Sequence, residues 1–271
     1  MNQCEETIAL VQTIGKALLG RLSCVELNVR KKDNNHQNLV TDFDIWVQDQ
    51  LKMGLANIEP KAKFFAEEQE NARVEGLTWF IDPIDGTTNF ITMQRNFAIC
   101  VALYKGSKPI FGVVYDVVSD ICYHAIAGED AYRNGKRLPK RTTKAIEDAM
   151  VDMSLTTINN LSHHAQKPLY EISRAIRGHR AIGAASLAMC HIAEGALDVY
   201  VSYRLYPWDY AASGIILEAV GGVYESVYGE PLYTTEKSTL LCCGDMALAK
   251  NIGAYFRGEC DLSQLNKNIS N

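Results

Sequence analysis

Apolar residues recur at helical spacing in two segments near the N-terminus. Steps of three and four residues place such side chains on one face of a helix, so we predict two amphipathic helices packed on a common core. A polar stretch, residues 30–38, separates them and contains turn-forming residues. The first helical face consists of Val11, Ile14, Leu18, Leu22 and Val25, and the second of Phe43, Val47, Leu51 and Leu55.

Short apolar runs rich in β-branched and aromatic residues follow these helices. The first two runs lead directly into acidic residues, and the later ones succeed each other as in an antiparallel meander. The dipeptide Asn134-Gly135 is typical of a tight hairpin turn. The predicted strands cover residues 64–65, 79–81, 97–104, 110–118 and 121–126.

The pattern changes at about residue 143, where short strands alternate with helices. We expect a helix over 183–194, a strand over 197–201 and a helix over 209–220, with glycines following both helices. The chain is therefore predicted to be a single unit over 1–271, with an N-terminal α+β lobe (1–142) and a C-terminal α/β lobe (143–271). Helices and sheets would stack as a layered αβαβα sandwich.

Composition and charge narrow the classes of partner. A formal net charge of -5 and a pI near 5.7 argue against general affinity for nucleic acid or anionic membranes. The eight cysteines are scattered without a C-x-x-C pair, which is typical of reduced core thiols. The first residues lack the basic start and apolar stretch of a signal peptide, and no run reaches 18 apolar residues. We expect a cytoplasmic protein with no nucleic-acid or membrane partner.

Two aspartates end the apolar strand that carries Trp79 to Ile81. Asp82 and Asp85 stand in a turn in which Pro83 fixes its own φ and Gly86 lets an anionic ligand approach the backbone. A helix beginning near Thr87 would add free N–H groups and a favourable dipole. Together these features predict a phosphate cradle.

Other acidic residues also lie at the ends of predicted elements. Glu67 and Glu68 end one strand, Asp42 and Asp44 lie near the start of the second helix, and Asp209 opens a late helix. Carboxylates that converge in a cleft need a cation, and hard oxygen ligands without a His or Cys pattern favour Mg²⁺ or Mn²⁺. Two or three such ions would stabilise phosphoryl transfer and lower the pKa of an attacking water.

Each acidic residue also has a simpler interpretation. A lone Asp or Glu is most often a solvated acid or a helix cap, and for Asp44 N-capping is the main alternative. The basic run Arg30, Lys31 and Lys32 is interpreted as a solvated charge run, with contact to the acidic site as its alternative.

The segment Asp82 to Phe90 resembles the signature of the inositol monophosphatase family. Trp208 and Asp209 with the Ala-rich helix after them resemble its C-terminal signature, and residues 39–44 are similar to its segment before the second helix. These motifs and the Gly221-Gly222 turn keep their order over nearly the whole chain. The resemblance implies the family's fold and Mg²⁺-dependent hydrolysis of a small-molecule phosphate monoester. Inositol 1-phosphate is the substrate that the resemblance favours.

The resemblance also implies roles for individual residues. Thr87 and Glu67 would orient the attacking water, Asp44 would help to position a further metal or water, and the N–H groups of Gly86 and Thr87 would bind phosphate. Inhibition by lithium and a homodimer are implied as well. The implied metal ligands are Glu67, Asp82, the carbonyl of Ile84, Asp85 and Asp209, and the implied catalytic residues are Asp44, Glu67, Asp82 and Thr87.

The implied substrate-binding residues raise a question of specificity. Ser202 stands where inositol-specific members carry a glutamate that contacts ring hydroxyls, and Arg204 nearby could contact a second phosphate. Fructose 1,6-bisphosphate and NADP are therefore alternative substrates. A regulatory binding protein with little turnover is the alternative from another class, and the complete set of acids disfavours it. The segment that matches the family's pocket lining is Arg180, Gly183, Ala184 and Ala185.

Overall fold

The computed structural model describes residues 2–32, 39–69, 75–229, 232 and 236–265. The chain forms two compact units. The first contains Met1–Arg137 together with Gly183–Leu187 and Trp208–Ile216, and the second contains Leu138–Ile182, Ala188–Pro207 and Leu217–Asn271. Two short late segments thus belong to the unit built from the N-terminal half.

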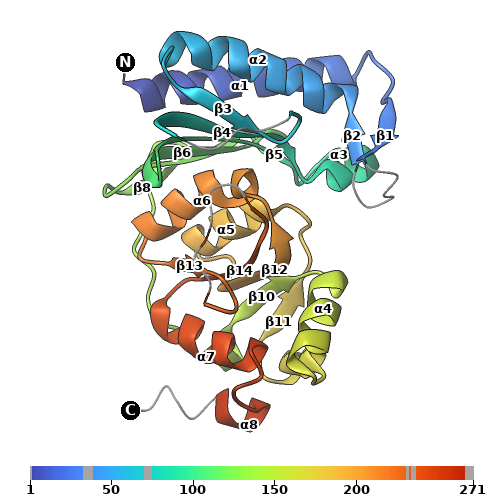
Figure 1. The fold of residues 1–271 in the computed structure, drawn as a ribbon, viewed down its shortest axis with the longest axis vertical. Helices are drawn as coiled ribbons and strands as arrows, with labels where there is room; N and C mark the ends of the chain where they lie inside the picture. The colour runs from blue at the N-terminus through green and yellow to red at the C-terminus, as the bar shows by residue number, and fades with distance from the viewer. Residues whose placement is uncertain (1, 33–38, 70–74, 230–231, 233–235, 266–271) are drawn as a thin grey trace. The chain divides into compact units, whose positions relative to one another are not determined.

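The first unit contains a seven-stranded sheet in the order β3-β4-β5-β6-β7-β8-β9 (Figure 1). All neighbouring strands run antiparallel except β3 and β4, which are parallel. The expected meander is confirmed, and Asn134 and Gly135 turn the β8–β9 hairpin with φ values of 49° and 74°. The strands are β3 (Lys63–Ala66), β4 (Leu77–Asp85), β5 (Ala98–Lys105), β6 (Lys108–Asp116), β7 (Ile121–Ile126), β8 (Ala131–Arg133) and β9 (Lys136–Arg137).

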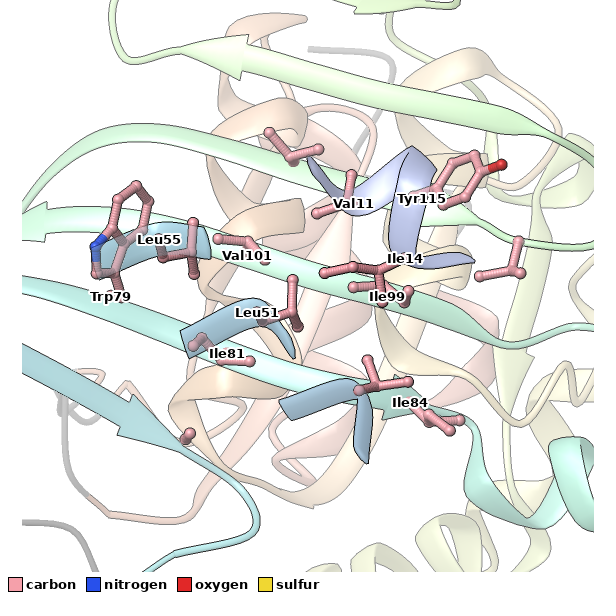
Figure 2. Packing of buried hydrophobic residues seen from close by; sticks show 14 of the residues in the cluster. Val11, Ile14, Leu51, Leu55, Trp79, Ile81, Ile84, Ile99, Val101 and Tyr115 are labelled. Atoms are coloured by element: carbon pink, nitrogen blue, oxygen red, sulfur yellow. The ribbon is translucent and has the colours of Figure 1, made fainter. Parts of the chain in front are cut away.

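Helices α1 (Gln3–Leu22) and α2 (Asp42–Ile58) cover one face of this sheet (Figure 1). Figure 2 shows the contact between them and the strands, in which fully buried side chains of both helices meet side chains of β4, β5 and β6. Both predicted helices are confirmed, but Val25 lies beyond the end of α1 and is 49% exposed. The labelled side chains are Val11, Ile14, Leu51, Leu55, Trp79, Ile81, Ile84, Ile99, Val101 and Tyr115.

The first turns of α6 (Pro207–Ala219) pack against strands of the same sheet. The Tyr104 hydroxyl donates a hydrogen bond to the Ala211 carbonyl at 3.1 Å, and the Trp208 ring lies 5.3 Å from that of Phe65. A Cβ on Gly112 would lie only 2.4 Å from the Ala212 carbonyl oxygen. Only glycine permits this close approach of the helix backbone to β6.

Three further elements complete the first unit. The hairpin of β1 (Val29–Lys31) and β2 (Leu39–Thr41) precedes α2, and its connecting residues 33–38 lie outside the described chain. Helix α3 (Thr87–Met93) follows β4. Helix α5 (Ala185–Glu194) begins in this unit and continues in the second.

The second unit contains a five-stranded mixed sheet in the order β11-β10-β12-β14-β13. Strand β10 is parallel to both neighbours, whereas β14 is antiparallel to β12 and β13. Strands and helices alternate as expected. The elements are η2 (Ile146–Asp148), β10 (Met150–Met153), α4 (Leu155–Ala165), η3 (Leu169–Arg174), β11 (Gly178–Arg180), β12 (Val199–Leu205), β13 (Val223–Glu225), β14 (Ser238–Cys243), α7 (Met246–Phe256) and α8 (Leu262–Leu265).

The cysteines are all free thiols. Six of them are buried, as core thiols should be, but Cys24 is exposed and Cys260 is half-buried. Among the described helices, none combines the length and apolar character that crossing a bilayer requires.

The buried carboxylate of Asp198 binds cations from the first segment of the second unit and so holds that segment against the sheet. The Asp198 side chain is 1% exposed and accepts hydrogen bonds from the Arg141 guanidinium at 2.9 Å and the Lys144 ammonium at 2.9 Å. It also accepts the Met150 N–H at 2.8 Å. One carboxylate therefore holds two cations from the segment before β10.

Replacing this buried carboxylate leaves two partly buried cations without their partner. We expect Asp198→Asn to lower the free energy of unfolding by about 3–5 kcal/mol, measured by urea denaturation. The matched control is Asp148→Asn, which breaks the solvent-exposed pair with Arg177. The control substitution should lower the free energy of unfolding by less than about 1 kcal/mol. Equal losses in the two variants would contradict a special contribution from the buried cluster.

Candidate active site

A bulge near the end of β4 positions two buried aspartates. The ladder with β5 pairs Asp82 with Cys100 but Asp85 with Ala98, so one extra residue lies on β4 between these pairs. Pro83, which has no N–H to give to a ladder, is accommodated in this bulge. The Asp82 carboxylate accepts the Ile84 N–H at 3.0 Å, which stabilises the turn. Local geometry therefore fixes the two carboxylates and the Ile84 carbonyl within one turn.

Gly86 connects this turn to α3. Its φ is 90°, in the left-handed region, and a Cβ would lie 3.0 Å from the Asn96 carbonyl oxygen and 3.1 Å from the Ala184 Cβ. A side chain here would be strained and crowded. The glycine thus lets the first turn of α3, beginning at Thr87, lie close to residues 183–184, which the sequence assigned to the substrate pocket.

Asp85 accepts three hydrogen bonds from the start of α5. The donors are the Ala185 N–H at 3.1 Å, the Ser186 N–H at 2.7 Å and the Ser186 hydroxyl at 2.5 Å. Asp85 thereby caps α5 from a distant part of the chain and occupies N–H groups that a helix start leaves unpaired. Burial raises the pKa of Asp85 to about 6, although the bonds from Ser186 and Ala185 act in the opposite direction.

The other acids lie around Asp82. The Glu67 N–H donates to the Ile81 carbonyl at 3.2 Å, which continues the β3–β4 pairing and brings Glu67 beside Asp82. Burial raises the pKa of Asp82 well above its usual range, and the charges of Glu67, Asp85 and Asp209 raise it further. Three acids from three separate regions of the sequence thus come close enough to Asp82 to disfavour its ionisation.

Lys32 lies against this cluster. Its ammonium donates to a Glu67 carboxylate oxygen at 2.9 Å and to the Glu68 carboxylate, and its side chain is only 20% exposed. Burial opposes the charged form, but the charges and hydrogen bonds of the two glutamates outweigh it and raise the pKa of Lys32. The interpretation of this residue as part of a solvated charge run is therefore wrong, and the alternative of contact with the acids holds.

Asp44 has two different neighbours. One carboxylate oxygen accepts the Thr41 N–H at 2.7 Å and the Thr41 hydroxyl at 2.5 Å, which forms the capping box that begins α2. The other oxygen lies 3.5 Å from the Thr87 hydroxyl, which also lies 3.1 Å from the Ile84 carbonyl. The capping alternative for Asp44 is confirmed, and its second oxygen still faces the candidate site. Burial raises the pKa of Asp44 to about 6.

The donor chemistry of the cluster fits a hard divalent cation. Carboxylate oxygens and one backbone carbonyl are the groups that Mg²⁺ prefers, and a cation would relieve the repulsion that raises the Asp82 pKa. Among the described residues, no three His, Cys, Asp or Glu side chains yet stand in an arrangement that could hold an ion. The Lys32 ammonium on Glu67 and the N–H groups of α5 on Asp85 engage carboxylate oxygens that a metal would share.

The predicted substrate-binding residues divide between the two units. Gly183, Ala184 and Ala185 lie beside Gly86 and Asp85 in the first unit. Arg180, Ser202 and Arg204 belong to the second unit, where Arg180 ends β11, Ser202 lies in the middle of β12 and Arg204 lies near the end of β12.

Sequence reasoning missed two residues that contact the predicted acids. Ser186 gives Asp85 two of its three hydrogen bonds, and nothing in its local sequence marks it, because its partner is about 100 residues away. Thr41 holds Asp44, and the spacing of a threonine three residues before an acidic residue was a readable capping signal.

Comparisons with known proteins bear on this site. The model of the inositol monophosphatase family matches residues 2–258. The chain is 35% identical over 222 residues to the inositol-1-monophosphatase of Bacillus subtilis (strain 168), covering 81% of this chain and 83% of that one. It is 34% identical over 212 residues to the fructose-1,6-bisphosphatase/inositol-1-monophosphatase of Aquifex aeolicus (strain VF5), covering 74% and 78%.

Solved structures agree with the sequence relatives. The crystal structure of SaIMPase-II bound to inositol monophosphate superposes with a TM-score of 0.75 at 26% identity, over 96% of this chain and 94% of that one. Its 2′AMP-bound form gives a TM-score of 0.76 at 28% identity, over 96% and 95%. The predicted layered fold is therefore confirmed. The chain belongs to the inositol monophosphatase family, whose members are phosphoric monoester hydrolases.

Proposed function

We propose that this protein hydrolyses a small-molecule phosphate monoester with Mg²⁺ and a directly attacking water, and that inositol 1-phosphate is the first candidate substrate. The observation that carries the proposal is the convergence of Glu67, Asp82, Asp85 and Asp209, which raises the pKa of Asp82. A carboxylate buried beside other acids, at such a cost to its own ionisation, is typical of a cation site.

The metal ligands we propose are those of the acidic cluster together with the Ile84 carbonyl. When bound, two or three Mg²⁺ ions, or Mn²⁺ in their place, would supply positive charge to the phosphoryl group and lower the pKa of the attacking water. Asp82, Asp85 and Asp209 would provide carboxylate oxygens to these ions, and Glu67 would do so after release from Lys32.

Thr87 is placed to orient the water. Its hydroxyl lies between the Asp44 carboxylate and the Ile84 carbonyl, so either oxygen can accept its proton and leave a lone pair free for a water O–H. Asp44 is itself held by Thr41. We infer that Asp44 acts on the water through Thr87, and that Glu67 accepts the water's proton.

The phosphate would lie at the start of α3. The Gly86 and Thr87 N–H groups precede the first hydrogen-bonded turn of that helix, where backbone donors have no intrahelical acceptor. The left-handed conformation of Gly86 also lets an anion approach the backbone closely.

Two relatives support alternative substrates on the same site. The Aquifex aeolicus protein is named for both fructose-1,6-bisphosphatase and inositol monophosphatase activity, and SaIMPase-II binds 2′AMP as well as inositol monophosphate. Ser202, in place of an acid that would contact ring hydroxyls, favours weaker selection for a cyclitol. A regulatory role with little turnover is less well supported, because a binding module has no need of the full acidic set.

Three further properties stay predictions. A homodimer, inhibition by lithium and a cytoplasmic location rest on the family resemblance and on the composition of the chain.

The first test replaces single charged ligands. Asp85→Asn or Asp209→Asn should reduce kcat by about 10²- to 10³-fold or more. Each change removes a negatively charged metal ligand while the side chain keeps nearly the same shape. Phosphate release should be measured with and without Mg²⁺ on inositol 1-phosphate, fructose 1,6-bisphosphate and NADP. The matched control is Asp49→Asn, an exposed acid of α2, which should keep full activity. Wild-type rates in both ligand variants would refute the proposed site.

The second test follows stability with pH. Burial raises the pKa of Asp44 and Asp85 from 3.8 to about 6, so the folded protein binds these protons more tightly than the unfolded chain. The contribution of these groups to metal-free stability should therefore fall as pH rises from about 4 to about 6. Mg²⁺ should reverse the loss above this range, because it binds the ionised carboxylates.

Thermal unfolding measures this effect directly. Mg²⁺ at about 100 times its Kd should raise Tm by about 5–10 °C at pH 7.5 and by much less at pH 5. Asp209→Asn should abolish most of the rise. A shift that is the same at both pH values would argue against metal binding by these carboxylates.

A further inference from the structure

The residue before α5 cannot cap that helix. Ala184 has no side-chain oxygen that could accept the free N–H groups of the first turn. Asp85 supplies the acceptors instead, from 100 residues away in the sequence but within the same unit. Its carboxylate therefore caps a helix and also belongs to the acidic cluster.

Ser186, the second residue of α5, commits both of its donors to Asp85. A serine inside a helix often bonds to a carbonyl of its own helix, but the fully buried Ser186 hydroxyl donates to Asp85 Oδ2 at 2.5 Å. A hydroxyl at this distance from a carboxylate forms a strong, charge-assisted hydrogen bond. The Ser186 N–H donates to the same oxygen at 2.7 Å. Two donors of one residue thus converge on a single oxygen.

The hydrogen bonds of Asp85 divide unequally between its two oxygens. Oδ2 accepts both Ser186 donors, whereas Oδ1 accepts the Ala185 N–H at 3.1 Å. A carboxylate has about four lone-pair directions, two on each oxygen. Among the described residues no further donor reaches Asp85, so the remaining direction belongs to Oδ1. A cation that approaches Asp85 therefore finds one available oxygen.

The neighbouring acid Asp82 is less restricted. In the described part of the chain its carboxylate accepts one backbone N–H, that of Ile84 at 3.0 Å, on Oδ1. Asp82 and Asp85 are both buried in the same cluster, so burial does not account for the difference between them. The difference comes from the two donors of Ser186 and the N–H of Ala185.

Divalent cations differ in how many carboxylate oxygens they take. Ca²⁺ binds about six to eight oxygens and often takes both oxygens of one carboxylate. Mg²⁺ is smaller, requires near-octahedral geometry and usually keeps several waters beside one or two carboxylates. An acid that offers a single oxygen therefore suits Mg²⁺ better than Ca²⁺. The hydrogen bonds to Asp85 thus bear on the choice of metal.

We propose that Ser186 is a positioning residue of the metal site, which leaves only Oδ1 of Asp85 available to a cation and thereby favours Mg²⁺ over the larger Ca²⁺. The inference rests on the proposed function, because Asp85 is a metal ligand only within that proposal. Ser186 does not itself touch the metal, and its hydroxyl acts through Asp85. Loss of a hydrogen bond to a ligating carboxylate typically changes metal affinity about 10- to 100-fold.

The experiment measures the binding of each ion without turnover. Isothermal titration calorimetry gives the apparent Kd for Mg²⁺ and for Ca²⁺, in wild type and in Ser186→Ala, which removes the hydroxyl and keeps the N–H. We expect the ratio of the Ca²⁺ Kd to the Mg²⁺ Kd to fall about 10-fold in the variant, because Oδ2 can then contribute to the larger ion. Phosphate release from inositol 1-phosphate with Mg²⁺ should become correspondingly more sensitive to added Ca²⁺.

The matched control removes a different buried hydroxyl of the same unit. Thr7 is fully buried in α1, and its hydroxyl donates to the Gln3 carbonyl of its own helix at 2.8 Å. Thr7→Val keeps the shape of the side chain and should leave the ratio of the two Kd values unchanged. Both variants lose a buried hydrogen bond and should lower Tm, so Tm alone does not distinguish them. Only a role at the metal site changes the ratio.

The outcomes separate the two proposals. If wild type binds Mg²⁺ and the ratio is the same in Ser186→Ala, the inference is overturned and the proposed function stands. The same conclusion follows if Thr7→Val changes the ratio as much as Ser186→Ala does. If neither ion binds to wild type, the proposed function fails and the inference fails with it.

Discussion

Mutual repulsion among buried carboxylates is the constraint around which the first unit is organised. Asp82 lies among the charges of Glu67, Asp85 and Asp209, and burial denies Asp82 and Asp85 the hydration that would screen their own charges. Two groups of the protein reduce this repulsion. The Lys32 ammonium donates to Glu67, and N–H groups at the start of α5 donate to Asp85.

The elements around the site also serve as its scaffold. The capping box of α2 fixes Asp44, the β4 bulge fixes Asp82, and the cap of α5 fixes Asp85. In each case the same interaction shapes a helix start or a strand and also orients an acidic side chain. For Asp44 the capping of α2 and the proposed role beside Thr87 are compatible, because they involve different carboxylate oxygens.

Much of this arrangement could be predicted from the sequence, because its signals are local. The helical periodicity of α1 and α2, the Asn134-Gly135 turn and the strand ending in Asp82 are all read within a few residues. Contacts that depend on distant partners could not be predicted. The sequence offered contact between the basic run and the acidic site only as an alternative, and it did not identify Glu67 as the partner of Lys32. Nothing near Ser186 indicates its contact with Asp85. Val25 fits the helical pattern although α1 ends three residues earlier. The register shift of β12 against β14, between Ser202 and Leu205, likewise depends on the pairing strand.

The composition of the first unit bears on how the protein is made. Its sheet and two covering helices are encoded before residue 138, but it also needs Gly183–Leu187 and Trp208–Ile216. A nascent chain emerging from the ribosome therefore exposes Phe65, Tyr104 and Gly112 of that sheet until the start of α6 has been translated. Neither half of the gene encodes a self-sufficient catalytic piece, and any split or truncation before residue 216 leaves the acidic cluster without Asp209, the first turns of α6, or both.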